Sequence, residues 1–336
     1  MEKFKTHKMR SSVNWKSMFR EWGMIFVILL IVVVATIRRP AFLSVSNLIN
    51  ILRSYSTIGI AALGMAYVII GGGMDLSISS TVSLSAVVTM FVINGTVVEG
   101  VSPVYATFLA LAAGIIIGAL VGCIGGGIMA AVNGQMGESF IITYALQIII
   151  AAVANGVVGG KFQAAGYKSG LFKQIGMGLN PVIIFLVMAV ILQIILVKTI
   201  FGRNLYFLGA NMKAAKMAGI KTRQVRFWSH VICGICAGIA GVVVVSRVNS
   251  ASISQGLNYE MDAMACVAIG GTSLDGGSGS ITKTVLGVVM LGVLLNALNL
   301  LGVQANEQLI VRGAVVVIAV VLDTLNKKAK LKEVAK

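Results

Sequence analysis

The stretch GRNLYFLGANMKAAKMAGIKTRQVR, residues 202–226, is the longest polar interruption in a chain that is otherwise close to continuous hydrocarbon. From Lys198 to Arg226 the sequence has seven Lys or Arg residues and no acidic residue. Such a segment cannot lie inside a bilayer, because each Lys or Arg costs about 3 kcal/mol at the bilayer centre. It therefore predicts a loop outside the membrane that joins two spanning helices and contacts something in the cytoplasm.

Within this loop we expect a short helix with a smooth face of small residues. Ala210, Ala214 and Ala218 recur every four residues, which places them on one face of an α-helix. Gly219 follows the last alanine and is placed to end the helix, because glycine adopts a left-handed backbone at little cost.

The composition of the whole chain is that of a membrane protein. Of 336 residues, 57% are hydrophobic and 11% are charged, and the mean hydropathy is +0.95. Soluble domains carry about 25% charged residues. The apolar segments supply roughly ten runs of the ~20 residues that cross a ~30 Å hydrocarbon core. The predicted fold is therefore all-α, a polytopic helical bundle in which 39 glycines favour close packing.

The net charge of +16 follows from membrane topology and does not indicate nucleic-acid binding. Eighteen of the 27 basic residues lie in three clusters, at residues 1–20, 198–226 and 327–336. Clusters beside spans are typical of cytoplasmic segments and suit an anionic inner leaflet. With the N-terminus in the cytoplasm, ten spans return the C-terminal cluster to that side, and the loop after the sixth span, which holds the middle cluster, also lies there.

The expected organisation is a cytoplasmic basic tail (1–21), one transmembrane domain (22–325) and a second cytoplasmic basic tail (326–336). No small-residue cleavage site follows the first apolar run, so we expect an uncleaved span there. The expected spans are at about residues 22–37, 48–70, 76–98, 103–132, 139–158, 179–200, 227–249, 261–272, 281–302 and 304–325.

Two observations disagree with this topology. Arg38 and Arg39 would face outward, and so would the lysines of the loop 159–178. That loop and residues 250–260 would emerge on the outer side, either as a cover over a pathway, as a contact for an extracellular partner, or as plain connections.

Three glycine-rich segments occur at residues 71–80 (GGGMDLSISS), 270–280 (GGTSLDGGSGS) and 125–127 (GGG). Irregular backbone at membrane depth survives only where it is buried in protein or lines a cavity, and broken helices mark the path in transporters. The third segment has no polar residues beside it, which predicts a packing site. The first two supply candidates for a translocation path or gate: Gly72, Gly73, Asp75, Ser77, Gly270, Gly271, Thr272 and Ser273.

Three acidic residues have two interpretations each. Asp75 either caps a helix that begins near Leu76 or lines the path. Glu260 and Asp262, beside Tyr259 at an outer helix start, suit sugar hydroxyls but are also ordinary helix-capping residues. Both remain candidates for the path.

Residues that could carry enzyme chemistry are sparse, so we expect no catalytic, metal or cofactor site. The two histidines, His7 and His230, have neither metal-ligand spacing nor a nucleophile partner. No GxxxxGK[ST] motif is present, so the chain should not bind ATP itself. Four cysteines fall in apolar segments and are expected to be small buried hydrophobes: Cys123, Cys233, Cys236 and Cys266. Basic residues within spans should pair inward or reach the interface: Arg53, Arg247 and Arg312.

Four segments together resemble the permease subunits of bacterial ABC importers for ribose, xylose and galactose, within the larger family that includes branched-chain amino acid permeases. They are LGMAYVIIGGGMDLSISS (63–80), GANMKAAKMAGI (209–220), YEMDAMACVAIGGTSLDGGSGS (259–280) and LNALNLLGV (295–303). Met74 stands where that family usually has Ile or Val, and the outer loop around Lys161 matches nothing in it.

The resemblance implies a pore-forming dimer in the bacterial inner membrane that takes a monosaccharide from an extracytoplasmic binding protein. Cytoplasmic ABC ATPase subunits would drive it, and the second permease would be another copy or a different chain. Residues 209–220 would be the coupling helix that docks on the ATPase, with these contact residues: Gly209, Ala210, Asn211, Ala214, Ala215, Ala218 and Gly219.

A pentose such as ribose or xylose is the leading substrate, while a hexose, a sugar-like signal or a nucleoside are alternatives. An ion-driven secondary transporter is a further alternative, and it would need several paired carboxylates within the membrane.

Overall fold

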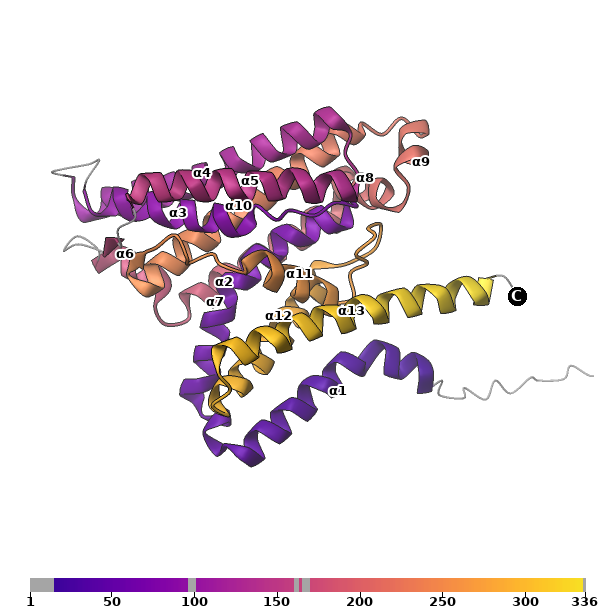
Figure 1. The fold of residues 1–336 in the computed structure, drawn as a ribbon, viewed down its shortest axis with the longest axis horizontal. Helices are drawn as coiled ribbons and strands as arrows, with labels where there is room; N and C mark the ends of the chain where they lie inside the picture. The colour runs from indigo at the N-terminus through magenta and orange to yellow at the C-terminus, as the bar shows by residue number, and fades with distance from the viewer. Residues whose placement is uncertain (1–14, 96–100, 160–162, 165–169, 335–336) are drawn as a thin grey trace, which may run out of the picture.

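A computed structural model describes residues 15–95, 101–159, 163–164 and 170–334, and over these residues the chain is a bundle of helices (Figure 1). Part of the expected N-terminal tail and most of the loop 160–169 lie outside the described residues. The elements, in order, are α1 (Trp15–Arg38), η1 (Pro40–Leu43), α2 (Val45–Ile70), α3 (Ile78–Ile93), α4 (Pro103–Val132), α5 (Met136–Val158), β1 (Gln163–Ala164), α6 (Gly170–Gly176), α7 (Asn180–Lys198), α8 (Ile200–Ala210), α9 (Met212–Met217), α10 (Thr222–Val248), β2 (Ser250–Ala251), α11 (Tyr259–Ile269), α12 (Ile281–Leu300) and α13 (Ala305–Val334).

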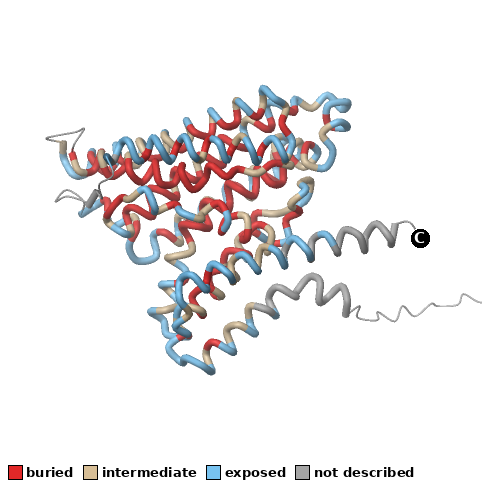
Figure 2. Tube along the Cα trace, in the orientation of Figure 1, coloured by how far each residue is buried: buried red, intermediate tan, exposed pale blue. Residues whose placement is uncertain are grey.

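The buried centre of the bundle is formed by α2, α3 and α10, whose residues are coloured as buried over most of their lengths in Figure 2. Tyr67 of α2 is fully buried, and its hydroxyl donates to the carbonyl of Leu192 in α7 at 2.6 Å. A buried hydroxyl needs such a partner, because an unmet hydrogen bond in apolar surroundings is costly. The bond ties α7 to the centre.

The most extensive helix contact among the described residues joins α4 to α10, and it is formed through glycines. A row at intervals of four residues runs along α4: Gly114, Gly118, Gly122 and Gly126. A Cβ on Gly118 would lie 2.7 Å from the Cα of Gly238, and one on Gly126 would lie 2.7 Å from the carbonyl oxygen of Phe227. Such rows let two backbones touch. The segment 125–127 does not interrupt α4 and includes Gly126, as expected of a packing site.

The fold class predicted from the sequence is confirmed: the chain is an all-α, polytopic membrane protein. Among the described residues, six helices are long and apolar enough to cross a membrane, namely α2, α4, α5, α7, α10 and α12. Large apolar side chains are exposed on the outward faces of α4, α5 and α7, where lipid would cover them. By contrast, α3 has 16 residues and α11 has 11, so the spans expected near 76–98 and 261–272 are partial helices.

A second, smaller core lies where α1 and η1 meet α2 and α12. Figure 1 shows α1, α12 and α13 apart from the layer that holds α3, α4, α5 and α10. In this core α1 packs on α12, around Phe42 and Val293. Asn47 and Asn296 exchange two side-chain hydrogen bonds, of 2.9 and 3.0 Å, and connect α2 to α12.

The glycine contact between α4 and α10 gives a testable prediction. Gly118→Ala should destabilise the protein by about 1–3 kcal/mol, because the new methyl group is forced into the backbone of α10. Gly127→Ala is the matched control on the same helix, since no atom lies within 4 Å of a Cβ there. Thermal unfolding of the detergent-purified variants should show a lower midpoint for the first and no loss for the second. Equal midpoints would contradict this packing.

Candidate coupling surface and translocation path

The polar loop 202–226 holds two helices in place of the single helix expected. α8 ends at Ala210, and the backbone of Asn211 is extended, with φ −160° and ψ 104°. The Asn211 side chain accepts a hydrogen bond from the backbone N–H of Ala214 at 3.0 Å and so caps a new helix, α9. The expectation of one face through Ala210, Ala214 and Ala218 is therefore wrong, because a capping asparagine offers the backbone a better partner than the continued helix.

The end of this segment was predicted correctly. Gly219 has φ +77°, its N–H donates to the carbonyl of Lys216 at 3.0 Å, and the N–H of Ile220 donates to the carbonyl of Ala215 at 3.1 Å. This pair of bonds is the Schellman pattern that ends a helix.

The exposed side of α9 differs from the expected alanine face. Ala214 and Ala218 are exposed, whereas Ala215 is only 2% exposed and faces inward. Met217 is 90% exposed, an unusual position for a large apolar side chain. Sequence analysis passed over Met217, although its spacing of three residues from Ala214 could have indicated a shared face. Beside α9, a groove of about 450 Å³ between α8 and α10 is lined in part by Ala218, Gly219 and Trp228.

The end of α8 touches both glycine-rich helix breaks. A Cβ on Gly209 would lie 2.5 Å from the backbone N of Gly277 and would also collide with the carbonyl of Ile70. A Cβ on Gly276 would lie 2.7 Å from the Cα of Gly72 and 3.1 Å from that of Gly209. We call these four residues, Gly72, Gly209, Gly276 and Gly277, the glycine junction.

The glycine junction is held by hydrogen bonds as well as by contact. The N–H of Gly277 donates to the carbonyl of Ile70, at the end of α2, at 2.9 Å. The Tyr206 hydroxyl on α8 donates to the carbonyl of Gly279 at 2.8 Å, and burial raises the pKa of this phenol, so it stays protonated as a donor. The φ angles of Gly72, Gly276 and Gly277 are +76°, +91° and +72°, which side chains with a Cβ rarely adopt.

The first helix break is supported by α5. The Ser139 hydroxyl donates to the carbonyl of Met74 at 2.6 Å and accepts from its N–H at 3.0 Å. Thr143, one turn later, accepts from the N–H of Leu76 at 3.0 Å. Gly73 lies against Ser139 as well. These bonds replace those that a continuous helix would supply, as irregular buried backbone requires.

Asp75 is buried within this break, with 4% of its surface exposed. Its Oδ1 accepts from the N–H of Ser77 at 3.0 Å and from the Ser77 hydroxyl at 2.6 Å. The expected role of binding backbone N–H near a helix start is thus present, but α3 begins at Ile78 and Ser77 occupies the cap position. Among the residues that the structure describes, no hydrogen bond joins Asp75 to Glu260 or Asp262.

The second break follows α11. Gly270 ends that helix, Gly271 has φ +78°, and the N–H of Ser273 donates to the carbonyl of Ser278 at 3.0 Å to close the turn. Thr272 and Ser273 are 1% and 5% exposed. The Thr272 Oγ1 is buried and has no partner among the described residues.

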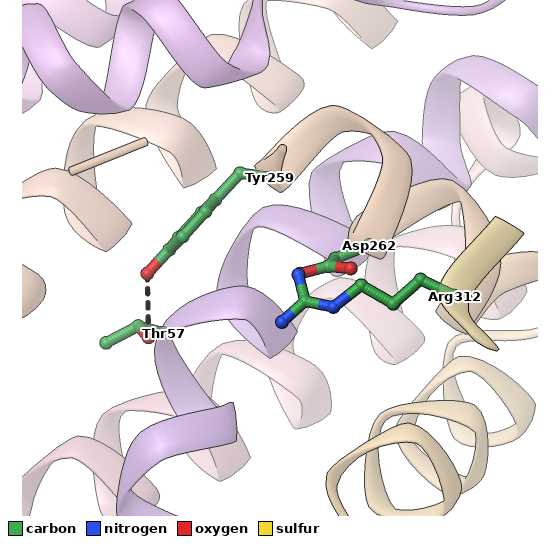
Figure 3. Close-up of polar contacts among 4 residues, drawn as sticks. All are labelled: Thr57, Tyr259, Asp262 and Arg312. Carbon is green, nitrogen blue, oxygen red and sulfur yellow. Dashed lines mark hydrogen bonds and ion pairs between the residues drawn. The ribbon is translucent and has the colours of Figure 1, made fainter. Parts of the chain in front are cut away.

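The start of α11 is braced to two other helices (Figure 3). The Tyr259 hydroxyl shares a hydrogen bond of 3.2 Å with Thr57 of α2. Arg312 of α13 donates to Asp262 Oδ2 at 2.7 Å, the one ion pair found among the residues the structure describes. The expectation that Arg312 pairs inward is confirmed. Its partner is 50 positions away in the sequence, which spacing arguments cannot detect.

Other expected features have mixed outcomes. Arg53 Nε and Arg247 Nη1 are buried without partners among the described residues. Of the cysteines, Cys233, Cys236 and Cys266 are buried as expected and Cys123 is half-buried. No group of residues that could hold a metal ion occurs in the described part of the chain.

Comparison with known proteins agrees with this architecture. Residues 47–320 match the model of the family described as branched-chain amino acid transport system / permease component. No solved structure matches the chain.

Three curated relatives cover almost the whole chain. The ribose import permease protein RbsC of Bacillus subtilis is 37% identical over 96% of this chain and 98% of its own length. The D-allose transport system permease protein AlsC of Escherichia coli is 33% identical over 94% and 95%. The L-arabinose transport system permease protein AraH of Escherichia coli is 31% identical over 96% and 95%. The chain therefore belongs to the branched-chain amino acid transport system / permease component family, among the permeases of ABC sugar importers.

Proposed function

We propose that this chain is the membrane permease subunit of an ATP-driven importer that translocates a monosaccharide, with a pentose such as ribose as the leading substrate. The names of the relatives support a sugar, and ribose and arabinose are both pentoses. The allose permease keeps a hexose as an alternative. An extracytoplasmic binding protein delivers the sugar, and both termini of the permease lie in the cytoplasm.

The observation that carries the proposal is the exposed helix α9, which directly follows α8, the helix that touches both helix breaks at Gly209. α9 presents Met217 together with the exposed Lys213 and Lys216, and the groove beside it extends the surface. Apolar anchors that insert into a partner's pocket dominate the energy of many interfaces. The partner proposed here is the cytoplasmic ABC ATPase, since the chain has no P-loop motif of its own.

The glycine junction then connects this docking surface to the path. Because Gly209 lies against Ile70 and Gly277, a displacement of α8 and α9 pushes on the end of α2 and on the turn after α11 together. Packed backbones have no soft side chain between them that could absorb such a movement. In this proposal, ATP-driven motion of the ATPase reaches both helix breaks in one step. The permease acts as a dimer with a second permease, which in the simplest case is another copy of this chain.

The function is tested by reconstitution with the ATPase and the binding protein in proteoliposomes. ATP-dependent uptake of D-ribose is the expected result, with D-allose and L-arabinose as comparisons. The ion-driven alternative predicts uptake that survives ATP depletion and collapses with the proton gradient. That outcome would overturn the proposal.

The docking surface gives a second prediction. Met217→Asp should weaken ATPase binding by about 2 kcal/mol or more, roughly 30-fold in affinity, because a charge replaces the exposed apolar anchor. Ala214→Trp, on the same side of α9, should also abolish ATP-dependent uptake while the protein remains in the membrane. Met177→Asp is the matched control, since Met177 is exposed between α6 and α7. Normal ATPase binding and uptake by the two α9 variants would argue against this surface.

The glycine junction gives a third prediction. Gly209→Ala should reduce sugar uptake at least tenfold, because its methyl group displaces the ends of α2 and of the second break. Although Gly209 was expected among the ATPase contacts, its Cβ would face Ile70 and Gly277, so the ATPase should still bind. Gly137→Ala is the control, as nothing lies within 4 Å of a Cβ at that position. Uptake is measured alongside ATPase co-purification. Full uptake by Gly209→Ala would disprove the role of the junction.

A further inference from the structure

The first turn of α11 starts in the interior of the bundle, against the first turns of α3. Residues 250–258, part of the segment 250–260 that was expected on the outer side, fold back so that the N–H of Gly256 donates to the Ser83 hydroxyl of α3 at 3.0 Å. Ser250 and Ala251 are buried and pair with β1. Two partial helices, α3 and α11, therefore begin side by side inside the protein.

The three polar side chains at the start of α11 have different surroundings. Tyr259 is bound to Thr57 of α2, and Asp262 is bound to Arg312 of α13, so both act as braces. Glu260 is 7% exposed and makes no such brace. The side chains of Ser79 and Gln147 lie near its carboxylate, while its Oε2 has no partner among the described residues.

A buried carboxylate oxygen without a hydrogen-bond donor destabilises the protein unless a ligand donates to it. Leaving such an acceptor unmet costs more than the net gain of an ordinary hydrogen bond, because its hydration is lost. The positive end of the α11 dipole favours a negative charge in the first turn, so the arrangement suits the carboxylate. A neutral ligand that donates hydroxyl groups fills Oε2 without bringing a second charge into the bundle.

The side chains near Glu260 can also form hydrogen bonds with hydroxyl groups. The Ser79 hydroxyl both donates and accepts, and the Gln147 amide offers two donors and an acceptor. Adjacent hydroxyls on a sugar ring can therefore be met by three different helices: α3, α5 and α11. Partial helices whose first turns face a substrate are a recurrent arrangement in transporters.

We propose that Glu260, Ser79 and Gln147 form a transient binding site for the hydroxyl groups of the translocated sugar, with the carboxylate oxygen Oε2 as the acceptor. The proposal rests on the proposed sugar-import function and names the residues that the substrate contacts. Asp262 and Tyr259 are positioning residues that hold the first turn of α11 in place.

The test is uptake by the full complex in proteoliposomes, with D-ribose and its monodeoxy analogues as probes, each at saturating loaded binding protein. Wild-type protein should move at least one deoxy analogue about tenfold or more slowly than D-ribose. Glu260→Gln keeps the size of the side chain but removes the charge. It should slow D-ribose about tenfold or more and should move D-ribose and that analogue at similar rates. Glu307→Gln, the same change at an exposed position in the first turn of α13, should leave both rates unchanged.

The outcomes separate this inference from the function on which it rests. If the wild-type complex moves no sugar with ATP, the proposed function fails. If it moves D-ribose and Glu260→Gln moves it equally well, or keeps the same preference over the deoxy analogue, the site is overturned. If raised external Na⁺ or H⁺ restores uptake by the variant, Glu260 acts on a cation and the sugar site is likewise overturned. Gln147→Ala supplies an independent check, since it should reduce the same preference without removing the charge.

Discussion

The arrangement depends on backbone-to-backbone contact at glycines. Gly209 lies against Ile70 and Gly277 with no room for a Cβ, and Gly276 lies against Gly72 in the same way. A methyl group at any of these positions separates segments that are otherwise in direct contact. The end of α2, the end of α8 and the turn after α11 are consequently joined at one place, and that place links the exposed α9 to the interior.

Broken helices are tolerated here because other helices supply their missing hydrogen bonds. Ser139 and Thr143 of α5 bind the irregular backbone after α2, and Ser83 of α3 binds the backbone before α11. Each of these hydroxyls comes from a helix outside the break that it supports. The interior polar groups are thus a condition for having partial helices.

Much of the fold could be predicted from local sequence, and much of the site could not. Apolar runs located the long helices, and Gly219 correctly marked the end of α9. The break at Asn211 was missed because the alanine spacing runs through it, although an asparagine before a helix is itself a capping signal. The Asp262–Arg312 pair and the glycine junction join residues far apart in the sequence, so neither spacing nor composition could reveal them.

In the proposed function, α9 and the two helix breaks move together. Spin labels at Lys213→Cys and Ser278→Cys, on a background without native cysteines, report the distance between α9 and the second break. A second pair, Lys213→Cys with Glu307→Cys, reports the distance to α13. In the reconstituted complex, the first distance should stay constant between the ATP-free and ATP-trapped forms while the second changes. A change in the distance between the labels at Lys213→Cys and Ser278→Cys would contradict the joint movement of α9 and the second break.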